Sequence, residues 1–250
     1  MENIIKDALL LKILKEIEKH TNHIRVEHLE LKKPKSYKHA MFYDRDADEF
    51  ILKFQHGHPP TQQIICHELL HVCHSLDGWP DIYFLYEYPD DPALEDAIWV
   101  LIDLVQHVSM WPMLERLGYS ENAHWTKCTA TLARRANNLS ILRHIHLRSA
   151  NPVLAILLAQ ALLSPAEEAV KKQLRSAARD NFSVAFQGSQ SIVEMFESAR
   201  PFSQKSCLDA FWQAYSILEG KTEDLQFSYM SAKKSGFCQH VLDMAAGLAE

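Results

Sequence analysis

The stretch PPTQQIICHELLHVCHSLDG, residues 59–78, determines the fold that we expect for this chain. Its centre, HELLH at residues 67–71, places two histidines four positions apart. On an α-helix, positions i and i+4 face the same way, so both imidazoles can bind one zinc ion. A glutamate between them can act as a base toward a metal-bound water. The pattern therefore predicts His67 and His71 as metal ligands and Glu68 as the catalytic residue.

The residues around the motif favour a helix of ordinary length. With 14 histidines in 250 residues, the five-residue pattern alone would arise by chance in about one chain in twenty of this composition. Thr61 follows a pair of prolines and is a good helix-start residue, and Gly78 is a good stop. Between them, apolar residues recur at spacings of three and four: Ile64, Ile65, Leu69 and Val72. We predict an amphipathic helix with the two histidines off its most apolar face.

Composition limits the class of protein. Hydrophobic residues make up 47% of the chain and charged residues 23%, as in a globular protein with one sizeable core or a catalytic unit plus a smaller helical one. The formal net charge of −6 gives no global attraction to nucleic acid or to an anionic membrane. We therefore expect no nucleic-acid partner, and the sequence leaves the oligomeric state open.

Localisation is expected to be cytoplasmic, without a membrane anchor. Glu2 stands where a secretory signal would carry basic residues. The longest apolar run, residues 152–163, is too short to cross a bilayer and is interrupted by Gln160. The five cysteines are an odd number without the spacing of a disulfide framework, which is typical of free thiols in a reducing compartment.

The first half of the chain predicts a helix, three strands and the motif helix, in that order. Residues 2–20 have a helical apolar stripe, and 24–31, 39–43 and 49–54 are short segments rich in β-branched and aromatic residues. The intervening residues 44–48 suit a hairpin turn. We predict an α+β fold with a small antiparallel sheet packed beside the motif helix.

This order of elements resembles the zincin metallopeptidases across about residues 1–118. The nearer resemblance is to the compact cytosolic ImmA/IrrE-type peptidases, whose strand before the motif helix looks like residues 50–54 here. Those proteins usually have glycine as the fourth motif residue, whereas this chain has Leu70. The resemblance implies a zinc cofactor and a sheet edge at residues 49–54 along which an extended peptide pairs. An ordinary edge strand that binds nothing is the alternative.

The rest of the chain predicts helices. Asp91-Pro92 is a cap followed by proline, and it opens a helix that we expect to run to Trp111, with Pro112 restarting the pattern and Gly118 ending it. Beyond that glycine we find helical patterns and no strand pattern. We therefore predict a zincin-like domain at residues 1–118 and an α-helical extension at 119–250.

A catalytic zinc site needs a third protein ligand, and two residues compete for the role. Glu95 lies 24 residues after His71, about one turn into the second predicted helix, and its surroundings look like the ligand segment of zincins that use a glutamate. Alternatively, Glu95 only stabilises the N-terminus of the helix through its negative charge.

His107 is the second candidate, with Asp103 one turn earlier as a hydrogen-bonding partner for its imidazole. About 18 Å of helix separates the two candidates, so both cannot bind one ion. Other options are Asp91, Asp96 or no third protein ligand.

The predicted function is zinc-dependent hydrolysis of a peptide or a specific protein substrate in the cytoplasm. Zinc bound by His67, His71 and Glu95 would activate water, and Glu68 would take its proton. The candidates for stabilising the oxyanion are Tyr83, Tyr86, Tyr88 and His107. The alternative function is a zincin scaffold that serves as a sensor or interaction module with little or no turnover.

Overall fold

A computed structural model describes residues 1–21, 24–29, 39–44, 47, 49–55, 57–84, 92–144, 150–217, 225–228 and 236–247. The chain forms two compact units. The first comprises Met1–Asp81, Arg116–Tyr119 and Tyr229–Glu250, and the second comprises Ile82–Glu115 and Ser120–Ser228. The first unit thus takes in residues from the C-terminal end of the chain. The functional division at residue 118 stays a prediction.

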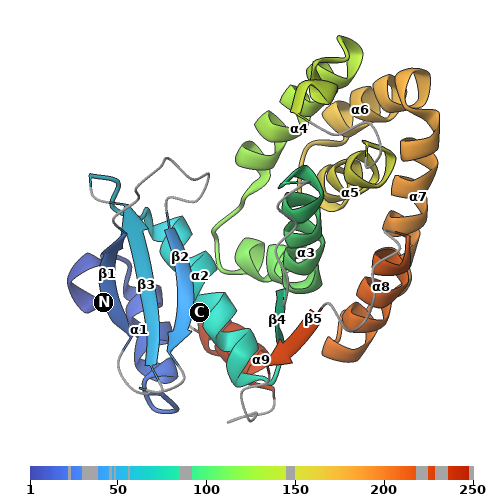
Figure 1. The fold of residues 1–250 in the computed structure, drawn as a ribbon. Helices are drawn as coiled ribbons and strands as arrows, with labels where there is room; N and C mark the ends of the chain where they lie inside the picture. Colours follow the sequence, from blue (N-terminus) through green and yellow to red (C-terminus); the bar gives the residue numbers. More distant parts are fainter. Residues whose placement is uncertain are drawn as a thin grey trace. The chain divides into compact units, whose positions relative to one another are not determined.

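The first unit is α+β, as predicted (Figure 1). Its elements are η1 (Glu2–Ile4), α1 (Ala8–Ile17), β1 (Arg25–Leu29), β2 (His39–Asp44), β3 (Glu49–Gln55), α2 (Gln62–Leu76) and α9 (Phe237–Ala246). The helix predicted over residues 2–20 is divided, because Asp7 adopts an extended conformation and caps α1 by accepting hydrogen bonds from the backbone of Leu9 and Leu10.

The sheet is mixed, with the strand order β1-β3-β2. The β2–β3 pair is antiparallel, as predicted, but β1 runs parallel to β3, so the prediction of an antiparallel sheet is wrong for this pair. β2 ends at Asp44 and β3 begins at Glu49, and so short a separation along the chain favours antiparallel pairing. β1 pairs with β3, which follows it only after β2 in the chain, and its direction therefore depends on packing rather than on local sequence.

β3 is the central strand, which corrects the expectation that residues 49–54 form a sheet edge. Phe50, Ile51 and Leu52 are buried one after another, so both faces of this strand are covered. Its backbone groups are used on both sides by β1 and β2. An extended peptide therefore cannot pair with β3 without displacing a strand.

The start of helix α9 is hydrogen-bonded to the residue that follows α2. Gly236 occupies the N-cap position of α9 and has no side chain with which to cap it. Asp77, which follows the last residue of α2, supplies the cap instead: its carboxylate accepts hydrogen bonds from the backbone of Phe237 at 2.6 Å and Cys238 at 3.1 Å. The contact joins segments 160 residues apart in sequence.

Replacing Asp77 by Ala is expected to lower the free energy of unfolding by about 2 kcal/mol, because two backbone donors at the start of α9 lose a charged acceptor. The carboxylate also lies at the unfavourable C-terminal end of α2, and removing it should offset only a few tenths of a kcal/mol. Chemical denaturation measures the change. Asp77→Asn, which keeps one acceptor oxygen, should lose less, and an unchanged stability of the Ala variant would contradict the capping role.

The second unit is mainly helical, as predicted. Its helices are α3 (Pro92–Arg116), α4 (Asn122–Asn137), η2 (Ser140–His144), α5 (Ala150–Leu163), α6 (Glu168–Asn181), α7 (Ser183–Ser198) and α8 (Gln204–Ser216). α5 is apolar on nearly every side and is buried, because α4, α6 and α7 pack around it. The hydrophobic core of the second unit includes Leu154, Leu158 and Leu162 of α5.

Two sequence predictions fail in this part of the chain. The short strand β5 (Leu225–Ser228) pairs with β4 (Asp81–Phe84), although no strand was expected after residue 119. A four-residue strand has too little pattern to be recognised without its partner.

The second failure concerns Pro112, which lies inside α3 and does not interrupt it. Its ring lies on an exposed position between buried Trp111 and Met113, so packing of the flanking residues maintains the helix.

One helix in the described part of the chain, Ala93–Arg116 within α3, is long and apolar enough to cross a membrane by length and composition alone. In the structure, 61% of this apolar window is buried inside the protein. A core helix of a globular protein has the same properties, so the segment is weak support for a membrane span.

Candidate metal centre

The motif helix begins where the sequence predicts. Thr61 adopts an extended conformation, and its hydroxyl oxygen accepts a hydrogen bond from the backbone of Ile64 at 3.3 Å. The helix ends at Leu76, and Gly78 then has a φ of 88°, in the left-handed region that favours glycine. Both ends are therefore set by local signals.

The burial of α2 differs from the prediction of an amphipathic helix. Its buried residues occur all round the helix: Ile65, Cys66, Glu68, Leu69, Leu70, Val72, Cys73, His74, Ser75 and Leu76. α1, α9 and β2 each pack against it, which explains why no broad polar face is left. His67 and His71 are half-buried, and their imidazoles are thus among the few side chains of the motif that retain contact with solvent.

The two motif histidines have the spacing of ligands to one metal ion. Their Nε2 atoms are 3.2 Å apart, and the rings meet edge to face with centroids 4.9 Å apart. Two nitrogens bound to a tetrahedral zinc ion at about 2.0–2.1 Å would lie about 3.3 Å from each other. The same distance suits an N–H···N hydrogen bond between neutral imidazoles when they hold no metal. The helix therefore holds two imidazole nitrogens at the spacing that a shared metal ion would need.

Glu68 lies between these histidines in sequence and is buried, with 7% of its surface exposed. A carboxylate is seldom buried to this degree without a specific role or partner. Its position in the motif makes it the candidate base toward a metal-bound water. The structure thus combines an ionisable group in a protected environment with two half-buried imidazoles.

His74, one turn beyond His71, has a different environment. It is 1% exposed and its ring stacks on Trp79, with centroids 4.5 Å apart and planes inclined by 23°. Burial, reinforced by the nearby His71, lowers the pKa of His74 to about 3. The imidazole is therefore neutral at physiological pH and serves as a packing residue, a role that the sequence did not distinguish from a metal contact.

The two candidates for the third ligand both lie on α3, which begins at Pro92 as predicted. Glu95 is half-buried in the first turn. His107 is also half-buried, and its ring lies nearly parallel to that of Trp111, with centroids 6.0 Å apart. Because α3 is continuous between them, the separation of about 18 Å along the helix holds.

Several other candidates lie outside the described residues. These are Asp91, Tyr86 and Tyr88, and the side chain of Tyr83 in β4 is likewise not described. The choice of an oxyanion-stabilising residue therefore stays a prediction.

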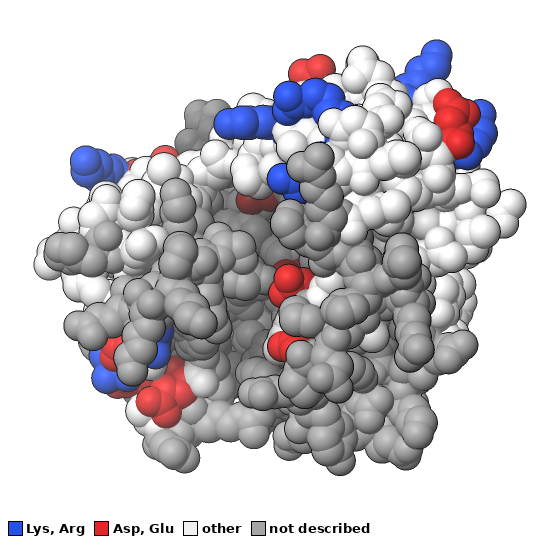
Figure 2. Space-filling view, turned by 45° about the horizontal axis from the view of Figure 1, so that its top comes forward, with Lys and Arg blue, Asp and Glu red and all other residues white. Residues whose placement is uncertain are grey.

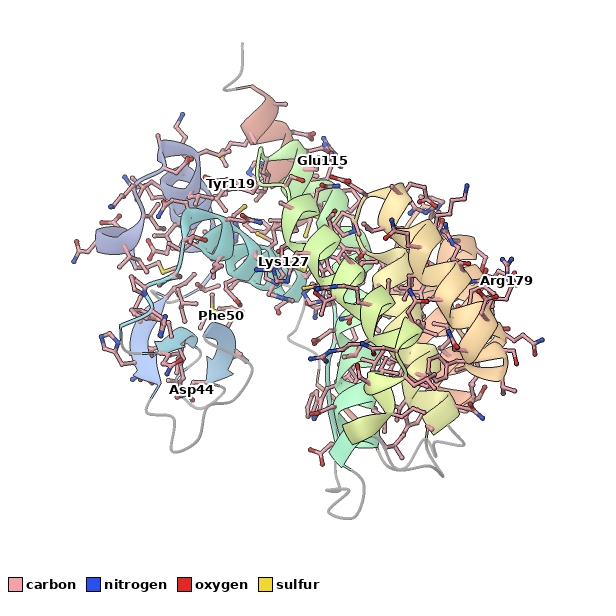
Figure 3. All side chains as sticks on the ribbon, turned by 90° about the horizontal axis from the view of Figure 1, so that it is seen from above. Asp44, Phe50, Glu115, Tyr119, Lys127 and Arg179 are labelled. Carbon is pink, nitrogen blue, oxygen red and sulfur yellow. The ribbon has the colours of Figure 1, made fainter. Side chains whose placement is uncertain are left out.

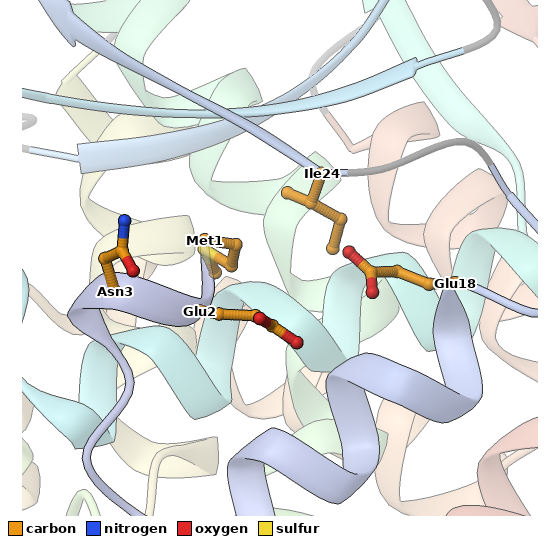
Figure 4. Close-up of a pocket in the computed structure, with 5 residues that line it drawn as sticks. All are labelled: Met1, Glu2, Asn3, Glu18 and Ile24. Carbon is orange, nitrogen blue, oxygen red and sulfur yellow. The ribbon is translucent and has the colours of Figure 1, made fainter.

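A pocket near the start of the chain does not have the composition of a metal centre (Figure 4). It is lined by Met1, Glu2, Asn3, Glu18 and Ile24. Two carboxylates and no histidine or cysteine are a poor match to the ligands of zinc. The motif helix remains the better candidate.

Comparisons with protein-family models, with curated proteins and with solved structures found no match. The resemblance to zincins thus depends on the motif, the order of elements and the residues described above.

Proposed function

We propose that this chain is a zinc-dependent metallopeptidase that hydrolyses a peptide or a specific protein substrate. The observation that carries the proposal is the 3.2 Å separation of the His67 and His71 Nε2 atoms on one helix. A zinc ion bound there would polarise the substrate carbonyl and lower the pKa of a coordinated water. Glu68, which follows His67 in the sequence and is buried, would accept the proton of the attacking water and later deliver it to the leaving amine.

The proposal takes its third ligand from α3. Support for His107 comes from the chemistry of the donors, because its imidazole is the same kind of ligand as those of His67 and His71. Three histidines are a known ligand set for catalytic zinc. Glu95, predicted from its spacing in the sequence, is the competing choice.

A cytoplasmic location is part of the same proposal. All five cysteines lie within the described residues and are thiols, three of them buried. Thiols of this kind are typical of a reducing compartment. No partner other than a peptide or protein substrate is proposed for this activity.

The direct test is the metal content of protein purified without a histidine tag. Elemental analysis should find about one zinc ion per chain bound by the motif histidines. The substrate can then be sought by comparing the protein termini in cells that produce the wild-type chain or the Glu68→Gln variant. Protein that is fully folded but binds no zinc at micromolar free concentration would contradict the proposal.

The third ligand can be identified from two single variants. If His107 completes the site, His107→Ala should weaken zinc binding by at least about tenfold, whereas Glu95→Ala should leave the affinity nearly unchanged. The reverse order would assign the role to Glu95, as the sequence spacing predicts. Competition with a chromogenic chelator measures both affinities. Equal and small effects would contradict a ligand from either position.

A further inference from the structure

A second pair of metal-ligating side chains lies on α4, apart from the motif. His124 and Cys128 are four residues apart, and both are exposed. The Nε2 atom of His124 is 3.6 Å from the Sγ atom of Cys128. Cys128 is the one cysteine classed as exposed, since three others are buried and Cys238 is half-buried.

The distance between these two atoms suits one shared cation. In tetrahedral zinc sites the metal lies about 2.3 Å from sulfur and about 2.0–2.1 Å from nitrogen, which separates the two donor atoms by about 3.6 Å. The pair matches this separation without a change of rotamer. An S–H···N contact would also fit, and binding of a metal would replace its proton.

The imidazole of His124 contacts one aromatic residue, Trp125, which is itself anchored by its neighbours. Its ring meets Trp125 edge to face, with centroids 5.6 Å apart. The indole N–H of Trp125 donates to Glu121 at 3.0 Å, and Trp111 donates to the same carboxylate oxygen at 3.2 Å. The two indoles also contact each other. Contact with this anchored indole restricts the rotation of the His124 side chain. Less side-chain entropy is therefore lost when His124 binds a ligand.

We propose that His124 and Cys128 form a second cation site, selective for thiophilic divalent ions such as zinc or cadmium. The thiolate and the imidazole occupy two coordination positions, and water fills the others. Binding forms a metal–sulfur bond and releases the thiol proton to solvent. Magnesium and calcium, which prefer oxygen ligands, are excluded by this donor set. The inference does not depend on the proposed peptidase activity.

The surroundings favour a weak, exchangeable site. α4 carries the exposed cations Lys127, Arg134 and Arg135, and basic side chains gather over α4 and α6 (Figures 2 and 3). These charges oppose a bound cation. Partial burial raises the pKa of the Cys128 thiol, and neighbouring Lys127 lowers it only in part. The thiol is therefore protonated at neutral pH, and a bound metal has to displace this proton, which lowers the apparent affinity.

Cobalt and cadmium titrations of the full chain test the proposal. A His67→Ala, His71→Ala double variant removes the motif site, so that a failure of the proposed peptidase site cannot be mistaken for a failure of this one. In that background, Co²⁺ should produce a thiolate-to-metal charge-transfer absorption in the near ultraviolet. Cys128→Ser should abolish this band, and His124→Ala should weaken Co²⁺ and Cd²⁺ binding by at least about tenfold.

Lys127→Ala is the matched control, because it changes the neighbouring charge on the same helix and keeps both ligands. It should retain the band and bind the ions as tightly as the parent or more tightly. Circular dichroism checks that each variant remains helical. The proposal is wrong if the His67→Ala, His71→Ala double variant shows no thiolate band. It is also wrong if the band persists when Cys128→Ser is added, because the band then belongs to another cysteine.

Discussion

Glu68→Gln should lower the rate of peptide hydrolysis by at least about 100-fold, the lower end for loss of a positioned general base. Gln has nearly the same volume and keeps a hydrogen-bonding side chain, but it cannot accept the proton of the attacking water. Because Glu68 is buried and is not one of the proposed ligands, zinc content should stay near that of the wild type. Rates are compared on the substrate identified from the cellular comparison.

Glu115→Gln is a suitable control, since it makes the same chemical change at an exposed position near the end of α3 and should leave the rate unchanged. Wild-type turnover by the Glu68→Gln variant would contradict the mechanism. If that variant has no measurable defect in the cell and no cleaved substrate is found, the alternative of a sensor or interaction module gains support.

The His67→Ala, His71→Ala double variant should lose nearly all zinc at the motif, with affinity reduced by at least about 100-fold, because both preset nitrogen ligands are gone. The experiment is done in a Cys128→Ser background, so that zinc bound by His124 and Cys128 does not add to the measured zinc content. Zinc at about 100 times its dissociation constant should stabilise the unmutated motif by about 2.7 kcal/mol, and this stabilisation should vanish in the double variant.

Elemental analysis and thermal denaturation with and without zinc measure these two effects. His58→Ala removes an exposed histidine shortly before α2 and should change neither. Stoichiometric zinc in the double variant would place the metal elsewhere in the chain, whatever the fold around α2.

The sequence alone predicted the features that depend on short-range contacts. Thr61 starts α2 and Pro92 starts α3 as expected, because helix caps are formed within a few residues along the chain. The pairing of His67 with His71 has the same origin: four residues of helix bring two side chains together whatever surrounds them. The two candidate ligands of the motif and the candidate base were therefore identifiable from the sequence.

Tertiary structure decided the features that join distant segments. The central position of β3 and the parallel alignment of β1 depend on which strand edges meet, and the local pattern of a strand does not specify its neighbours. The same reason applies to the capping of α9 by Asp77. The burial of α2 on nearly all sides arises from α1, α9 and β2 together, and the pattern within one helix reveals only its strongest apolar face.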